Sequence, residues 1–502
     1  MKSLKYTALA LMILGSSCTK FLEEDPQTFL TPETVATSLK DARAFADAPY
    51  ERLHGLLNGQ DASYGGNTYN LLEFLTGKAN SDLGQTGYVN YQTLTYNSTS
   101  FYVDTWWRQM YQGIGAANLA LSSIPKIEAV GLTDDVRNNM LAEAHTIRAL
   151  FYFELVRLYG AVPMVTSVVT NLDSIKPTRT DAKTIYDQII IPDLLAAEAS
   201  TLPWSDPSGR VGMGAVKSLL ADVYLTYAGK AIDGGEEFYA ESAKRSLEVV
   251  EDGGFTLFDE YTDMIDPANK NTKEFIWQSQ YAASQNVNNP LTALTIPNFS
   301  GISKYSDEYG SVWPTNEFIA SYPAGDKRVE EKEFYFSEYE AINGSGLKTF
   351  DHKYIYKYFD VNAVTETAKS DLNYTIYRLA DVMLMYAEAS NRAEGGPNAT
   401  AIDYVNQIRD RAALAPIGAL GQDAFEQEVW SQRYFELAFE NKMWFDIVRT
   451  RKVRNDVTGN FDDFVGHTRT IGGTFSEKNL LIPVPKQEFD VNPNVLPNNP
   501  GY

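Results

Sequence analysis

Apolar residues recur at intervals of three and four along much of the chain, which predicts a mostly helical protein. The stretch 133–160 is the clearest case, because Thr133 can cap its first turn and apolar positions follow at this spacing up to Tyr159. Pro192 should interrupt another helix, since proline removes a backbone donor. The pattern predicts helices over 31–57, 133–160, 180–195, 213–229, 238–250, 377–392, 399–413 and 423–449.

Small residues lie where these helices would cross, at positions such as Ala144, Ala228, Ala387 and Ala412. Paired helices that are joined by short turns and have small residues at their contacts favour tetratricopeptide-like helical hairpins. The spacing follows the strict 34-residue repeat only loosely. The scaffold is therefore predicted as a series of helical hairpins.

Two long segments, at about 58–103 and 255–375, have a different composition. They are rich in Gly, Asn, Ser, Thr, Tyr and Pro, and they contain only short strand-like pieces such as 275–278 and 353–359. Long irregular segments between packed helices commonly carry function. The predicted fold is mostly α, with a tetratricopeptide-like helical-hairpin scaffold, a large irregular loop-rich face for ligand binding and short strands.

The N-terminus has the layout of a secretory signal. Lys2 and Lys5 precede an apolar stretch at 6–14, then come three small residues and the only cysteine, Cys18. The apolar stretch is too short to span a bilayer. One interpretation of this layout is an ordinary signal peptide with an incidental cysteine near its end.

The order Leu14-Gly15-Ser16-Ser17-Cys18 resembles a bacterial lipobox, in which cleavage before the cysteine is accompanied by lipid attachment to its sulfur. This predicts Cys18 as the lipidation site and places the protein on a membrane surface. The predicted organisation is a lipoprotein signal peptide at 1–17, a lipidated tether at 18–30 and one globular domain at 31–502.

Charge and composition limit the classes of function. The chain has 65 acidic and 43 basic residues, and its net charge of −22 argues against binding to the nucleic-acid backbone. A single cysteine excludes an intrachain disulfide framework and a cysteine-based zinc site. Aromatic residues make up 13%, which is more than the core obviously needs.

No motif of the sequence demands catalysis. The chain has no nucleophile elbow, no phosphate-binding loop and no complete dinucleotide-binding motif. Glu436 and Glu440 lie one helical turn apart, beside Arg433 and Lys442, and are interpreted as a salt-bridged helix face. The histidines lie far apart and form no metal-binding spacing, at His54, His145, His352 and His467. The sequence therefore predicts a protein that is not an enzyme and has no cofactor and no metal.

Four groups of residues together resemble one family. They are Glu143–Leu155 with Tyr159–Pro163, Tyr377–Ala389 with Val405–Arg409, Arg433–Glu440 with Trp444–Arg449, and the closing Leu481–Pro485 with Asn492-Pro493 and Asn499–Tyr502. With the lipobox, they resemble the SusD/RagB family of outer-membrane nutrient-binding lipoproteins over essentially the whole chain.

The resemblance implies a cell-surface protein of Bacteroidota that captures oligosaccharides and delivers them, without cleavage, to a SusC-like TonB-dependent transporter. Acidic residues behind Cys18 resemble the signal that sends such lipoproteins to the exterior of the outer membrane. Binding of peptides is an alternative within the family. A glycan hydrolase stays open because a pair of catalytic carboxylates cannot be recognised from sequence, and a purely structural helical-repeat adaptor stays open as well.

Sugars offer apolar C–H faces and polar rims, so a binder needs flat aromatic rings together with amides and carboxylates. The resemblance places these groups in the two irregular segments, although each aromatic there could instead pack a loop on the scaffold. Trp106, Trp107, Trp430 and Trp444 are expected in the core. The predicted ligand-binding residues are Tyr64, Tyr69, Asp82, Tyr88, Tyr91, Tyr96, Tyr281, Asn286, Asn288, Tyr305, Tyr309 and Trp313.

Overall fold

Helices dominate the computed structural model of the chain, which describes residues 38–57, 68–84, 86–169, 175–285, 287–304, 308–342 and 344–502. The prediction of a mostly helical fold is confirmed. The α-helices are α2 (Leu39–Glu51), α3 (Thr68–Thr76), α4 (Thr86–Gln92), α5 (Phe101–Ser123), α6 (Asp134–Tyr159), α7 (Ala182–Ile185), α8 (Ile191–Glu198), α9 (Met213–Ala228), α10 (Glu237–Asp252), α11 (Leu291–Thr295), α12 (Asn316–Ala320), α13 (Leu379–Glu394), α14 (Ala399–Arg411), α15 (Gln422–Glu436), α16 (Met443–Thr450) and α17 (Lys486–Val491).

The strands are short and form antiparallel pairs. The longest pair is the hairpin of β6 and β7, which the sequence pattern did not predict as a unit. The pairs are β1 (Ala79–Asn80) with β5 (Trp313–Pro314), β2 (Val162–Pro163) with β3 (Arg179–Thr180), β4 (Phe275–Ser279) with β8 (Tyr374–Arg378), β6 (Tyr335–Glu340) with β7 (Leu347–Ile355), and β9 (Lys452–Arg454) with β10 (Phe461–Asp463).

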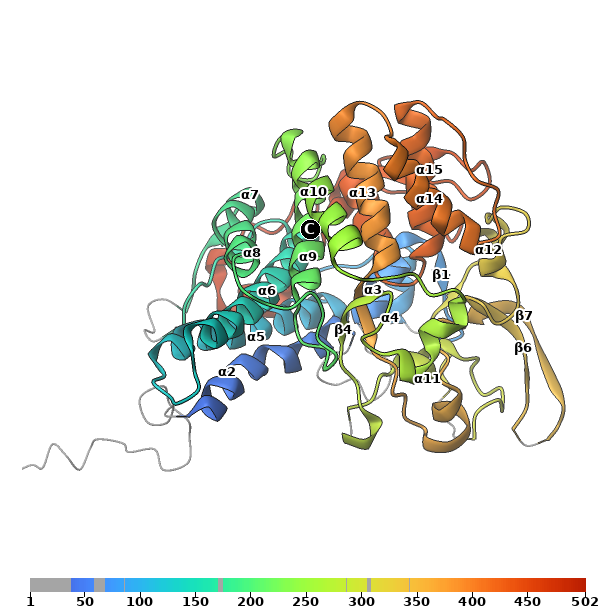
Figure 1. Cartoon of the computed structure of the whole chain (residues 1–502). Helices are drawn as coiled ribbons and strands as arrows, with labels where there is room; N and C mark the ends of the chain where they lie inside the picture. Colours follow the sequence, from blue (N-terminus) through green and yellow to red (C-terminus); the bar gives the residue numbers. More distant parts are fainter. Residues whose placement is uncertain are drawn as a thin grey trace, which may run out of the picture.

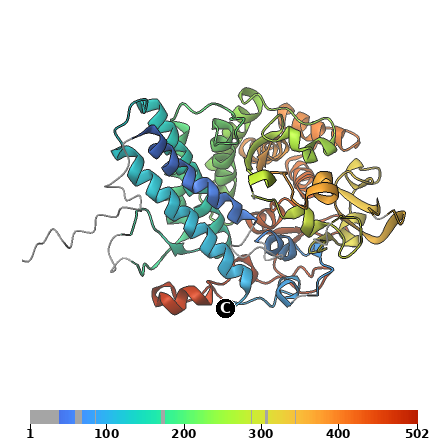
Figure 2. The ribbon, with the colours of Figure 1, turned by 90° about the horizontal axis from the view of Figure 1, so that it is seen from below.

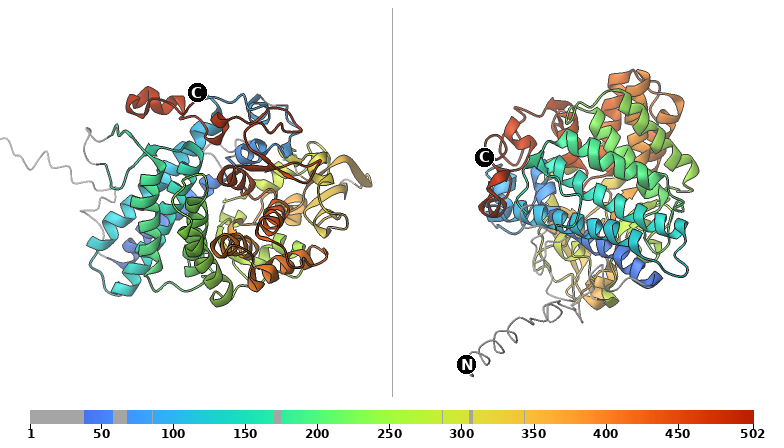
Figure 3. Two further views of the ribbon diagram at one scale, coloured as in Figure 1. Left: turned by 90° about the horizontal axis from the view of Figure 1, so that it is seen from above. Right: turned by 90° about the vertical axis from the view of Figure 1, so that its left-hand side faces the viewer.

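The long helices pack one against the next along the chain. α2 lies across α5 and α6, α6 contacts α8, and α8 contacts α9 (Figure 2). α10 then packs between α9 and α13, which in turn contacts α14 and α15 (Figure 3). The β6–β7 hairpin and α11 lie on the other side of the molecule from α10 and α13 (Figure 1). The helices thus form a scaffold, and the loop-rich segment covers one side of it.

Local capping signals explain why several predicted helix ends are confirmed. The Thr133 side chain accepts the Val136 N–H at the start of α6, and Gly160 ends this helix with a φ of +69°. Five π-helical residues, Tyr186–Ile190, separate α7 from α8 just before Pro192. The predicted interruption at this proline is therefore confirmed. In the described residues, no helix is both long and apolar enough to cross a membrane.

The single helix predicted over 423–449 is wrong, because α15 ends at Glu436 and α16 begins at Met443. Donors from distant segments take the carbonyl groups that a continuous helix would use. Lys357 donates to the carbonyl oxygens of Glu436 and Ala438 at 2.8 and 3.0 Å. Phe439 adopts a φ of +61° between the two helices.

The expected irregularity of residues 58–103 is also wrong in part, because α3 and α4 lie within this segment. α3 is buried on all described sides, and even its polar residues Asn70, Glu73 and Thr76 lie in the interior, so it is not a surface helix with an exposed polar face. The expected core positions of Trp106, Trp107 and Trp444 are confirmed, whereas Trp430 is only half-buried. The predicted strand at 353–359 ends earlier, at Ile355.

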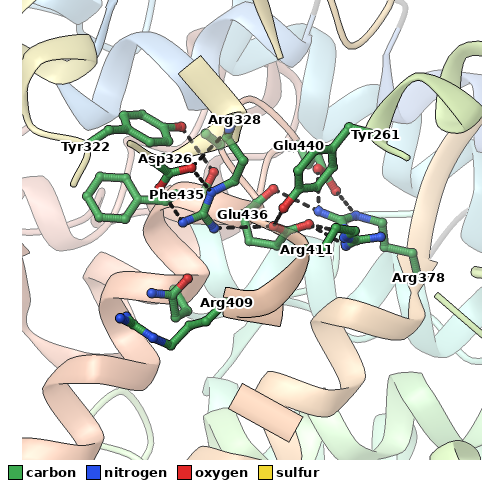
Figure 4. A network of polar contacts seen from close by, with 12 residues as sticks. Tyr261, Tyr322, Asp326, Arg328, Arg378, Arg409, Arg411, Phe435, Glu436 and Glu440 are labelled. Atoms are coloured by element: carbon green, nitrogen blue, oxygen red, sulfur yellow. Dashed lines mark hydrogen bonds and ion pairs between the residues drawn. The ribbon is translucent and has the colours of Figure 1, made fainter. Parts of the chain in front are cut away.

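A buried ionic network joins β8, α14 and α15 (Figure 4). The Arg378 guanidinium donates to the carboxylates of Glu436 and Glu440 at 2.8 and 2.9 Å. Arg411 donates to Glu436 at 2.8 Å, and Arg328 lies 3.3 Å from the same carboxylate. Glu436 and Glu440 are ion-paired, but the expected salt-bridged helix face is wrong, because both carboxylates are buried and the neighbours Arg433 and Lys442 pair with Asp381 instead.

The network keeps its carboxylates ionised. Burial acts to raise the pKa of Glu436, but the Arg411 and Arg378 guanidinium groups outweigh it and hold this pKa well below its usual range. Burial likewise opposes the effect of Arg378 and Lys357 on Glu440, whose pKa is also lowered. Groups held in the charged state by fixed partners serve the scaffold rather than proton transfer.

Candidate functional site

Five of the predicted ligand-binding tyrosines lie inside the core, with side chains that are at most 2% exposed. The Tyr91 and Tyr96 rings stack with centroids 5.2 Å apart, and the Tyr69 hydroxyl donates to the carbonyl oxygen of Phe439 at 2.9 Å. A ring that protein covers on both faces leaves no surface for a ligand. The expected exposure is therefore wrong for Tyr69, Tyr88, Tyr91, Tyr96 and Tyr281.

Other predicted residues lie outside the described ones or have structural partners. Tyr64, Asn286, Tyr305 and the predicted lipidation site Cys18 lie outside the described residues. The Asn288 carboxamide oxygen accepts the Ser370 N–H at 2.6 Å, and the Tyr309 side chain is half-buried. Ligand contact by these residues stays a prediction.

Asp82 and Trp313 are two of the predicted ligand-binding residues, and the fold brings them together from distant parts of the chain. Asn80 of β1 lies opposite Trp313 of β5, and the Asp82 N–H donates to the Gly310 carbonyl at 2.8 Å. Gly310 has a φ of +53°, and a Cβ there would lie 2.0 Å from a carboxylate oxygen of Asp82. Only glycine permits this close approach.

The strand β7 adds two rings to this pair. The Trp313 indole stacks on the His352 imidazole, with centroids 3.7 Å apart and an interplanar angle of 21°. The Tyr354 hydroxyl donates to Asp82 Oδ2 at 2.7 Å, and His352 Nε2 lies 3.6 Å from Asp82 Oδ1. Burial and Asp82 both raise the pKa of Tyr354, so its phenol stays a neutral donor.

An exposed aromatic residue lies beside this cluster. The Asn298 N–H donates to Asp82 Oδ2 at 3.2 Å, and the next residue, Phe299, is 84% exposed with a φ of +48°. A bulky residue in the left-handed region is uncommon and points to a conformation that the surroundings impose. We call Asp82, Asn298, Phe299, Trp313, His352 and Tyr354 the Trp313 site.

A buried carboxylate holds the loop that presents Phe299. Glu308 accepts the backbone N–H groups of Ser300 and Ser303 at 2.6 and 2.7 Å. The Ile342 N–H, from the turn between β6 and β7, donates to the Gly301 carbonyl at 3.2 Å. These hydrogen bonds therefore hold in place residues 300–303, which directly follow the exposed ring.

The Trp313 site combines the half-buried rings of Trp313 and His352, the buried ring of Tyr354, the exposed ring of Phe299 and a carboxylate. Such a surface can stack against an apolar face and accept hydrogen bonds from hydroxyl groups. No group of three His, Cys, Asp or Glu side chains within the described ranges is arranged to hold a metal ion.

Sequence reasoning missed Phe299 and His352. His352 was set aside because it lies far from the other histidines, and its stacking on Trp313 depends on the pairing of distant strands. Phe299 lies among the turn-forming residues Asn298, Ser300 and Gly301. An aromatic residue inside such a turn is the local signal that could have identified it.

Two family models match the chain. The model of the SusD family matches residues 326–502. The model described as "Starch-binding associating with outer membrane" matches residues 20–225.

Similar proteins cover nearly the whole chain. A SusD superfamily protein from Parabacteroides distasonis, known from a crystal structure, is 46% identical, with 92% of this chain and 99% of that chain covered and a TM-score of 0.89. SusD-like protein P2 of Formosa agariphila is 28% identical, and the alignment covers both chains completely. A laminarin-binding SusD-like protein is 23% identical, with 93% of this chain and all of that chain covered and a TM-score of 0.75. At this last identity the likeness concerns the fold.

Proposed function

The chain belongs to the SusD family, and from that premise we propose that it is a nutrient-binding protein of the bacterial outer membrane whose ligand is an oligosaccharide. The laminarin-binding relative and the starch-binding description of the second family model support a carbohydrate as the ligand class. We propose capture without cleavage as the role of the protein. We further propose that the folded part is one globular domain.

The Trp313 site is the observation that carries this proposal. A pyranose ring has an apolar C–H face that suits the exposed Phe299 ring and the edge of the Trp313–His352 stack. Its hydroxyl groups suit the Asp82 carboxylate, which the fold already orients through Tyr354 and Asn298. Preorganised rings lose little conformational entropy when a ligand binds.

The N-terminus and the family support a proposal for the position in the cell. We propose that Cys18 carries a lipid anchor and that the protein faces the exterior of the outer membrane. We propose a SusC-like TonB-dependent transporter as its partner, to which the bound glycan is delivered. The description of the second family model as associating with the outer membrane supports this location.

Calorimetric titration against a panel of oligosaccharides tests the ligand class. The panel contains β-1,3-, α-1,4- and β-1,4-linked glucan oligomers, and short peptides represent the alternative within the family. We expect saturable binding of at least one glucan and no product after prolonged incubation. Turnover at substoichiometric protein would favour a hydrolase, and a blank for every glycan with binding of peptides would replace the proposed ligand.

The anchor has its own test. Cys18→Ala should abolish labelling by a radioactive fatty acid and move the protein from the membrane fraction to the soluble fraction. Cys18→Ser is a second variant that keeps the size of the side chain and should behave in the same way. Retention of either variant at the membrane would contradict a lipid anchor at this residue.

A further inference from the structure

A cavity of about 800 Å³ lies at the ends of α6, α9 and α16, next to the C-terminal loops. It shares no lining residue with the Trp313 site. Its size falls within the range of small-molecule sites, roughly 300–1,000 Å³. Its walls are mainly apolar and include Val156, Tyr186, Ile232, Phe445, Val448 and Leu481.

Two cationic side chains of the lining have no carboxylate partner among the described residues. Arg451 donates to the Val448 carbonyl at 2.7 Å and forms no ion pair, and Lys478 lies over the Tyr502 ring at 5.2 Å. Burial lowers the pKa of Arg451, as expected for a guanidinium that no anion compensates. Two cations without a carboxylate partner therefore lie at one cavity.

The other charged groups of the lining are accounted for. Arg157 lies 3.8 Å from Asp222 and is also paired with Glu154. Arg449 pairs with Glu388 at 2.5 Å. Asp463 pairs with Lys452 at 2.7 Å, and Glu477 lies exposed to solvent. Among the unpaired charges of the lining, the two cations Arg451 and Lys478 therefore outnumber the one carboxylate, Glu477.

Three buried polar atoms of the lining also have no hydrogen-bond partner within the described part of the chain. They are the Tyr186 hydroxyl, Thr226 Oγ1 and Arg157 Nε. Protein atoms cover all three of them, so they do not face the interior of the cavity. Apolar walls with a few polar or charged groups are typical of a ligand site.

We propose that this cavity binds a small organic carboxylate with an apolar body. The carboxylate would be held by Arg451 and Lys478, and the apolar body would lie against Phe445 and Val448. The guanidinium of Arg451 can offer two parallel N–H donors to such a group. This site is independent of the proposed glycan binding, because it requires none of the residues of the Trp313 site.

Titration of the full chain with decanoate, below its micelle-forming concentration, tests the proposal. Decanamide is the matched probe, since it has the same apolar chain and no charge. We expect saturable binding of decanoate and at least about tenfold weaker binding of decanamide. Arg451→Gln should weaken decanoate by about tenfold and leave decanamide unchanged. Equal affinities of the two probes, or no effect of Arg451→Gln, would overturn the carboxylate site.

A cavity-filling variant tests the location. Ile232→Trp should abolish decanoate binding while the thermal unfolding midpoint stays close to that of the wild type. Trp313→Ala serves as the control and should bind decanoate with unchanged affinity. Undiminished binding by Ile232→Trp would place decanoate elsewhere and refute the proposal, whatever the outcome of the glycan titrations.

Discussion

Removal of the Arg378 guanidinium should strongly destabilise the fold. This side chain is 2% exposed and donates to three carboxylates, those of Glu274, Glu436 and Glu440, at 2.7, 2.8 and 2.9 Å. In Arg378→Met, these carboxylates would retain only Arg411 and Lys357 as further cationic partners, since the charge of Arg328 is balanced by Asp326. A buried charge would remain uncompensated.

Breaking a buried ion pair by removing one partner costs about 3–5 kcal/mol. A typical domain has a free energy of unfolding of about 5–15 kcal/mol, so Arg378→Met should lose a large part of it. Urea unfolding, followed by tryptophan fluorescence at pH 7, measures the loss. The urea midpoint should fall while the m-value stays unchanged.

Two further variants show whether charge imbalance is the cause. Arg378→Met/Glu440→Gln removes one carboxylate together with the guanidinium, and it should recover part of the lost stability. Lys486→Met breaks an exposed pair within one helix, that of Lys486 with Asp490, and should cost less than about 1 kcal/mol. A loss below about 1 kcal/mol in Arg378→Met, or no recovery in the double variant, would refute the reasoning.

Three further predictions concern titration and the loop of Phe299. Burial raises the pKa of Glu73 to about 8. The protonated carboxyl therefore contributes its full free energy of unfolding below about pH 4.5, and this contribution is lost as the pH rises through 8. Glu73→Gln should remove up to about 5 kcal/mol of this decline, which urea titrations at several pH values measure. Burial acts to raise the pKa of Asp381, but the charges of Lys442 and Arg433 outweigh it and lower this pKa to about 2. Asp381→Asn should therefore lower the free energy of unfolding by about 2 kcal/mol at pH 6, and the difference from the wild type should vanish as the pH falls through 2. Glu308→Ala should speed hydrogen exchange of the amides at 300–303 and weaken glycan binding; unchanged exchange would contradict its role.

Helix ends could be predicted where the signal is local. Thr133 and Gly160 bound α6 at the expected residues, because capping depends only on neighbouring backbone groups. The break between α15 and α16 could not be predicted, because Lys357 and Arg378 reach the carbonyls of 436–438 from other parts of the chain. Tertiary contacts override local periodicity at such points.

The candidate site could be predicted only in part for the same reason. Asp82 and Trp313 were identified from residue type, and strand pairing brings them together. Tyr88 and Tyr91 have the same residue type and a similar neighbourhood in sequence, yet both lie on α4 and are buried against Phe74 of α3 and Tyr102 of α5. Whether a loop aromatic is a platform or a core residue depends on the helix it packs against, and no local pattern gives that partner. The exposure of Phe299 likewise depends on Glu308.

Calorimetric titration of Phe299→Ala, with the glucan that binds the wild type, tests whether the glycan binds at the Trp313 site. The Phe299 ring is exposed, so its removal should leave stability nearly unchanged and report on binding alone. Val130→Ala is the matched control, because Val130 is a fully exposed apolar residue outside the Trp313 site. We predict that Phe299→Ala weakens glycan binding by about tenfold, equivalent to about 1.4 kcal/mol, while Val130→Ala has no effect. Equal affinities of wild type and Phe299→Ala would contradict the Trp313 site as the place where the glycan binds.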